Sequence, residues 1–179
     1  MENSDFDNFI NEINKVKKKE SQVDWSARRE EWLEYLSVLY NKVEVFLQPY
    51  VESGKITLEE KSVKLNEEYI GSYDATALDL FMGNIQITLT PVGTSNIIGA
   101  RGRVDMRGPR GTVKFVLVPE GSSRVNIRMD IREKSVSEQQ TSKPVDNWEW
   151  KISTRPPVIS FIKLEEESFQ TALLEVANG

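Results

Sequence analysis

Three successive stretches of this chain, residues 98–107, 112–118 and 124–132, alternate apolar with polar side chains. Side chains on a β-strand point to opposite faces with a period of two, so each stretch predicts a strand with one apolar and one polar face. The segment 108–111, Gly-Pro-Arg-Gly, favours a tight turn, and a second turn is predicted at 119–123. The pattern therefore predicts an antiparallel sheet whose inner face is apolar.

The polar face of this predicted sheet is rich in basic residues. Its outward positions hold seven cations: Arg101, Arg103, Arg107, Lys114, Arg124, Arg128 and Arg132. Only two acids, Asp105 and Asp130, accompany them. Because the whole chain has a formal net charge of −5, the remainder of the sequence must be acidic. The pattern thus predicts a segregation of charge, with a cationic sheet face as the candidate binding site.

Counting through the two turns predicts which residues face each other across neighbouring strands. Arg107 should face Thr112, Asp105 should face Lys114, and Lys114 should face Arg128 across the second turn. Uncompensated cations on one face repel each other unless solvent or an anionic partner screens them. The face can be interpreted as an ordinary solvated surface of an antiparallel sheet, or as a binding surface for an acidic partner.

Apolar residues with helical spacing occur both before and after the predicted strands. An amphipathic helix is predicted over residues 5–19, either packed on the sheet or serving as an arm that docks on a partner. A longer helix should begin after Asp24 and run to about Gln48, where Pro49 favours its end. A final helix is predicted to open with the glutamates at 165–167, which suit the positive end of the helix dipole.

The segments between the strands and the last helix are less regular. Residues 133–146 are polar and predict a loop. After it, Trp148 and Trp150 alternate with charged residues, so both should lie on one face of a strand, either as an aromatic platform or as a seal over the core. Pro156 and Pro157 should end this strand.

Taken together, these elements predict an α+β fold. We expect two N-terminal helices, an antiparallel meander sheet of about six to eight strands, and a C-terminal helix packed on one sheet face. Residues 1–22 should form an N-terminal amphipathic helix or arm, and residues 23–179 a single α+β domain. A strongly curved sheet wrapped around the last helix, with a ligand cavity as in helix-grip folds, is the structural alternative.

The composition excludes several kinds of chemistry. The chain has no histidine and no cysteine, so Ser-His-Asp triads, cysteine nucleophiles, thiolate metal sites and histidine metal sites are ruled out. No phosphate-binding loop occurs either. Carboxylate, lysine or tyrosine catalysis and a magnesium site stay open, but no motif marks them. We therefore name no cofactor, no metal and no catalytic residue, and the balance leans against an enzyme. Because no secretory signal or apolar span is evident, we expect a cytoplasmic protein that does not enter a membrane.

Three classes of function fit this pattern. The leading hypothesis is a non-enzymatic protein-interaction module, of the adaptor, chaperone-like or immunity type, that binds an acidic protein with its cationic sheet face. The second is a nucleic-acid-binding protein that uses the same arginines. The third is a small-ligand-binding protein, or a carboxylate enzyme, with its site in a cavity of a curved sheet. The sequence also leaves a homo-oligomer open.

Overall fold

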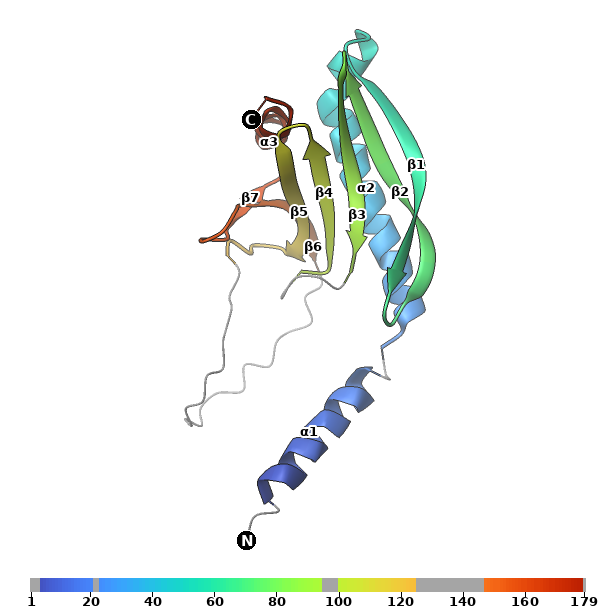
Figure 1. Ribbon diagram of the computed structural model, residues 1–179, viewed down its shortest axis with the longest axis vertical. Helices are drawn as coiled ribbons and strands as arrows, with labels where there is room; N and C mark the ends of the chain where they lie inside the picture. The colour runs from blue at the N-terminus through green and yellow to red at the C-terminus, as the bar shows by residue number, and fades with distance from the viewer. Residues whose placement is uncertain (1–3, 21–22, 95–99, 125–146, 179) are drawn as a thin grey trace.

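The computed structural model describes residues 4–20, 23–94, 100–124 and 147–178, with the side chains of the first helix described over residues 6–14. Within these described residues, three helices and seven strands follow one another (Figure 1). The helices are α1 (Ser4–Glu20), α2 (Trp25–Glu52) and α3 (Glu166–Asn178). The strands are β1 (Thr57–Glu67), β2 (Gly71–Met82), β3 (Ile85–Gly93), β4 (Gly102–Gly108), β5 (Gly111–Pro119), β6 (Trp148–Ser153) and β7 (Phe161–Lys163).

The seven strands form one open sheet in the order β1-β2-β3-β4-β5-β6-β7. Each neighbouring pair is antiparallel, so the topology is a meander. The predicted α+β fold, with a meander sheet and a C-terminal helix on the sheet, is confirmed. Strand β1 forms one edge of the sheet, and at the other edge β7 is extended by the Arg124–Ser160 bridge and by a hydrogen bond from the Phe161 N–H to the Ser123 carbonyl. Among the described strands β1 and β7 do not pair with each other, so the sheet stays open.

Helix α2 supplies most of the helical half of the core. Asp24 caps its first turn by accepting a hydrogen bond from the Ala27 backbone N–H at 3.0 Å. One stripe of the helix is buried against the sheet: Trp32, Leu36, Leu39, Tyr40, Val43 and Leu47. The helix continues through Pro49 to Glu52, slightly beyond the predicted end. A proline in the last turn loses a single backbone hydrogen bond, which the packing of α2 outweighs.

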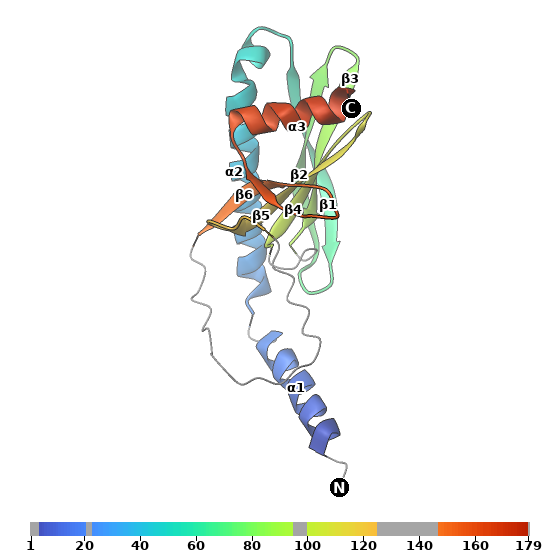
Figure 2. The same cartoon turned by 90° about the vertical axis from the view of Figure 1, so that its left-hand side faces the viewer.

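The sheet and α3 complete the core. The inward positions of β4 and β5 are fully buried, as the alternation predicts, and include Val104, Met106 and Phe115. Phe169 of α3 contacts Phe115, with ring centroids 6.1 Å apart. Figure 2 shows α3 crossing α2 next to the sheet, so that a single hydrophobic cluster joins both helices and the strands.

One predicted strand neighbour is wrong. We expected residues 124–132 to return beside β5 and to place Arg128 opposite Lys114, but β5 pairs with β6, and Lys114 faces Ser153. Strand β6 carries Trp150 and Ile152 on its inner face, and both are buried. Burial of these side chains in the core stabilises the pairing of β5 with β6. Residues 125–132, and the predicted loop at 133–146, lie outside the described residues.

Helix α1 lies beyond the N-terminal end of α2, away from the sheet (Figure 1). Its apolar side chains Phe6, Phe9, Ile10 and Ile13 are between 39% and 64% exposed. These exposures are incompatible with a helix packed on the sheet in this structure. Among the described helices, none is long and apolar enough to cross a membrane.

Candidate binding surface

The outward face of β4 and β5 carries the central part of the predicted cationic face. The register places Arg107 opposite Thr112 and Asp105 opposite Lys114, as counting through the turn predicted. Arg103 faces Val116, which is fully buried. The outward face is therefore only partly solvated, and each cation must be considered with its own surroundings.

Arg103 is neutralised on the face itself. Its Nε and Nη2 atoms donate hydrogen bonds of 2.7 and 2.8 Å to the two carboxylate oxygens of Asp105. This bidentate contact raises the pKa of Arg103 above its ordinary value. The two residues are two positions apart on one strand, so their side chains point the same way. The pair contributes no net charge to the surface.

Arg107 and Lys114 remain as the outward cations of β4 and β5 without an ion pair. Both are exposed, and no acid in the described part of the chain lies within 4.0 Å of either side-chain nitrogen. Their register makes them diagonal neighbours across the two strands, within reach of one ligand. These two residues are the part of the predicted site that the structure brings together.

A groove of about 410 Å³ opens beside Lys114, where β5 begins and β6 ends. Its apolar lining comes from both sheet strands and the segment after β6: Val113, Ile152, Ile159, Phe161 and Ile162. Its charged lining is Arg103, Lys114, Arg155 and Glu175. We call this feature the basic groove. Val113 and Ile152 are buried at the base of the groove, whereas Ile159, Phe161 and Ile162 are half-buried or exposed.

Arg155 and Glu175 line the basic groove but were not among the predicted site residues. Arg155 Nη2 lies 2.7 Å from the Glu175 carboxylate of α3, and both side chains are largely exposed. An exposed ion pair of this kind is weak and can be rearranged by a ligand. No periodic signal in the sequence marks either residue, since Arg155 follows a strand and Glu175 lies on a helix that is distant in the chain.

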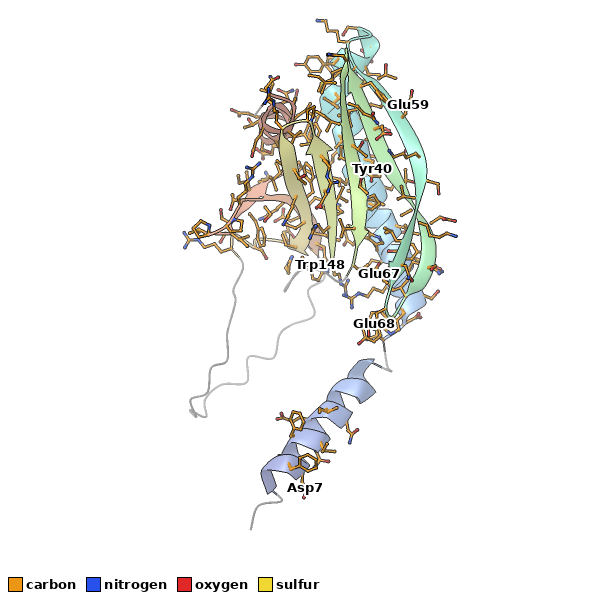
Figure 3. The ribbon with its side chains drawn as sticks, in the orientation of Figure 1. Asp7, Tyr40, Glu59, Glu67, Glu68 and Trp148 are labelled. Atoms are coloured by element: carbon orange, nitrogen blue, oxygen red, sulfur yellow. The ribbon has the colours of Figure 1, made fainter. Side chains whose placement is uncertain are left out.

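Arg101 does not lie on the outward face, which corrects the prediction. Strand β4 begins one residue later, and the Arg101 side chain reaches α2, where Nη1 contacts both oxygens of Glu31 at 2.7 and 2.8 Å. Its guanidinium also lies over the ring of Trp148, 4.7 Å from the centroid. An acid and an aromatic face together hold a cation better than solvent does. Figure 3 shows Trp148 at the same end of the sheet as Glu67.

Of the remaining predicted cations, the structure describes only Arg124. Arg124 is exposed, follows β5 and forms an isolated bridge with Ser160. Arg128 and Arg132 lie outside the described residues, as does Asp130. Among the described residues, the predicted face therefore consists of Arg107 and Lys114, with Arg103 paired beside them.

The two tryptophans of β6 share one face, as their alternation predicted. Trp150 is buried, donates its indole N–H to the Tyr35 carbonyl at 2.7 Å, and has its ring 5.9 Å from that of Trp32. Trp148 lies partly buried beneath Arg101. The interpretation as a seal over the core is the one that fits these contacts.

Glu67 is the centre of a buried polar cluster, which lies at the end of the sheet where Trp148 is found. One carboxylate oxygen accepts a hydrogen bond from the Tyr73 hydroxyl, and the other accepts from the Thr94 N–H at 2.9 Å and the Thr94 hydroxyl at 2.6 Å. Burial, and next the contact with Glu67, raise the pKa of Tyr73 well above its ordinary value. Every polar atom of the cluster is satisfied, so its geometry is that of a structural site.

Comparisons with known proteins supply no further assignment: no family model matches the chain, and neither a curated protein nor a solved structure matches it. In the described ranges, no group of three or more acidic, histidine or cysteine side chains is placed to hold a metal ion.

Proposed function

We propose that this chain is a non-enzymatic interaction protein whose basic groove binds an acidic and partly apolar segment of a partner protein. The observation that carries the proposal is the composition of the groove, which combines five apolar side chains with three cations and one acid. Apolar contact supplies affinity, and unmatched charge selects the partner and speeds its association.

The charge balance supports an anionic occupant. Within the groove Arg103 is already paired with Asp105, and Arg155 with Glu175, whereas Lys114 has no acid within ion-pair distance among the described residues. Arg107 is the diagonal neighbour of Lys114 across β4 and β5, and it too has no ion-pair partner among these residues. A carboxylate that entered the groove would therefore meet Lys114 without displacing an existing pair.

The apolar lining favours a peptide over a nucleic acid. Ile162 is 47% exposed, and Phe161 and Ile159 are half-buried beside it. Aliphatic side chains such as leucine or isoleucine bury their surface well against such a lining. A nucleic-acid backbone makes most of its contacts with charge alone and would leave these side chains unused.

Random-peptide display on the intact chain would test the proposal. We expect the selected peptides to combine aspartate or glutamate with leucine, isoleucine or phenylalanine, and to bind less tightly as salt concentration rises. The double variant Lys114→Gln and Arg155→Gln should weaken the selected peptides by about tenfold at low salt, as loss of two partly exposed charges implies.

A matched control is the double variant Lys42→Gln and Lys64→Gln, which removes two exposed lysines on α2 and β1. It has the same change in net charge and should bind the peptides like the parent chain. The variant Ile162→Ser should weaken binding at every salt concentration. Selection of basic peptides, equal losses in the two double variants, or preference for an oligonucleotide of equal charge would contradict the proposal.

A further inference from the structure

Helix α1 displays an apolar stripe that nothing in the described part of the chain covers. Phe6, Phe9, Ile10 and Ile13 are all exposed, and the polar residues between them, such as Asp7 and Glu12, lie on the remaining surface. Isolated helices of this length are marginal in water, because most helical stability in proteins comes from packing of the apolar stripe. The helix therefore needs a partner surface.

The stripe has the spacing of a face that a second helix can cover. Apolar residues occupy positions 6, 9, 10, 13 and 16, and within this stripe positions 6, 9, 13 and 16 follow the a/d spacing of a coiled coil. A helix with the same stripe can therefore pack against it. The choice of partner rests on the charge of the helix.

The distribution of charge along α1 indicates which helix is its partner. The sequence places Asp5 and Asp7 in the first turn, whereas four lysines fall within the last six positions, 15–20. Two copies of the helix side by side in parallel would bring the lysine-rich ends together. In the antiparallel arrangement the acidic end of each helix lies beside the lysine-rich end of the other, and position 6 faces position 16. The helix is thus complementary to itself only when the second copy is reversed.

We propose that α1 pairs with α1 of a second copy of this chain in an antiparallel, two-fold symmetric coiled coil. Phe9 of each helix packs against Ile13 of the other at the centre of the pair. A two-fold contact of this kind is isologous, so it closes at two copies and leaves no free stripe. The basic groove lies in the other part of each chain and faces its own ligand independently.

Charge-exchanged variants of the full chain provide the sharpest test. A basic-helix variant carries Asp5→Lys, Asp7→Lys and Glu12→Lys, and an acidic-helix variant carries glutamate in place of Lys15, Lys17, Lys18 and Lys19. Sedimentation equilibrium should give the parent chain a concentration-dependent mass that approaches twice that of one chain. Each variant alone should remain a single chain, and an equal mixture of the two should recover the doubled mass.

Two further variants distinguish the contribution of the apolar stripe to the dimer from that of the basic groove. Phe9→Asp should raise the dimer dissociation constant by at least about tenfold, because it places a charge in the apolar seam. The groove variant Lys114→Gln and Arg155→Gln should leave the mass of the parent dimer unchanged, so that a failure of the groove proposal is distinguishable from a failure of this one.

Several outcomes would overturn the proposal. A mass of one chain for the parent at all concentrations would do so, as would a dimer that persists in both charge variants. Loss of the dimer in Val45→Lys, on the exposed face of α2, would place the helix on α2 instead. Binding of a monomeric parent chain to vesicles of anionic phospholipid would assign the stripe to a membrane surface.

Discussion

Gly102 of β4 lies directly against the ring of Trp32 of α2, so closely that a Cβ atom at position 102 would come within 2.1 Å of the ring atom Cζ3. Trp32 is only 2% exposed, and its ring also lies 5.9 Å from that of Trp150 on β6. The glycine thus permits a large indole to cross over the backbone of β4, which sets the distance between α2 and the sheet.

Gly102→Ala should lower the free energy of unfolding by about 2–3 kcal/mol, because the added methyl group overpacks a rigid part of the core. Denaturant unfolding monitored by circular dichroism measures this change. In a Trp32→Leu background the smaller side chain relieves the contact, so the same alanine should cost less, and the double-mutant cycle should give a clear coupling energy. Additive effects of the two substitutions would contradict the close contact.

The carboxylate of Asp79 predicts a pH dependence of stability. Burial tends to raise its pKa, but hydrogen bonds from Lys61 Nζ at 2.7 Å and the Thr88 hydroxyl at 2.5 Å outweigh burial, so the pKa lies below its ordinary value of 3.8. Between the lowered pKa and 3.8 the unfolded chain binds more protons, so stability rises with pH across this window.

Asp79→Asn should therefore lower the free energy of unfolding by about 1–2 kcal/mol at neutral pH, since hydrogen bonds to a charged group are lost. The deficit should shrink as pH falls below 3.8 and vanish below the lowered pKa of Asp79. Denaturant unfolding over a series of pH values tests this. The control Asp74→Asn, at an exposed position of the same strand, should lower stability at neutral pH much less. A deficit in Asp79→Asn that is independent of pH would contradict the assignment.

The local parts of the fold could be predicted from the sequence because they depend on periodicity. Alternation in β4 and β5 predicted the inner face and the pairing of Arg107 with Thr112, and helical spacing predicted a long helix that begins after Asp24. A hairpin register follows from counting through one turn, which requires no knowledge of the remaining chain.

The non-local parts could not be predicted by the same means. Whether β5 pairs with β6 or with residues 124–132 depends on the packing of Trp150 and Ile152, which only the assembled core decides. Likewise, the alternating pattern predicts that the Arg101 side chain points outward. Because Arg101 lies just before β4, its side chain can instead turn toward Glu31, which is seventy residues earlier in the chain. The basic groove draws on four separate segments for the same reason.

The placement of Arg101 changes the expected effect of its substitution. A residue on a solvated sheet face could be replaced at almost no cost, but Arg101 contacts both Glu31 and the ring of Trp148. Arg101→Gln should lower the free energy of unfolding by about 1 kcal/mol, since both contacts are partly exposed. Arg124→Gln, at an exposed position, should have an effect within about 0.5 kcal/mol.

Tryptophan fluorescence provides a local test of the same contact. Loss of the guanidinium admits water to the ring of Trp148, so Arg101→Gln should shift the emission to longer wavelength. The shift should be absent in a Trp148→Phe background, because the other three tryptophans do not contact Arg101 through a cation–aromatic pair. An equal shift in both backgrounds would place the change elsewhere.

The hydroxyl of Tyr73 predicts a second pH dependence, at the alkaline end. Its pKa is raised above 10.0 by burial and then by Glu67, whose carboxylate accepts a hydrogen bond from the hydroxyl and repels a phenolate. In the folded state Tyr73 should therefore stay protonated at pH values where the unfolded chain has released this proton. Between 10.0 and the raised pKa the folded chain binds more protons, so stability falls as pH rises.

Spectrophotometric titration of the folded chain should detect this proton directly. The parent and Tyr73→Phe should give the same tyrosinate absorbance up to about one pH unit above 10.0, because Tyr73 contributes nothing there. Glu67→Gln keeps the phenol but removes the charge, so it should bring the titration of Tyr73 back toward 10.0. If Tyr73→Phe instead lost absorbance near 10.0, the hydroxyl would be solvated, and the buried cluster around Glu67 would be wrong.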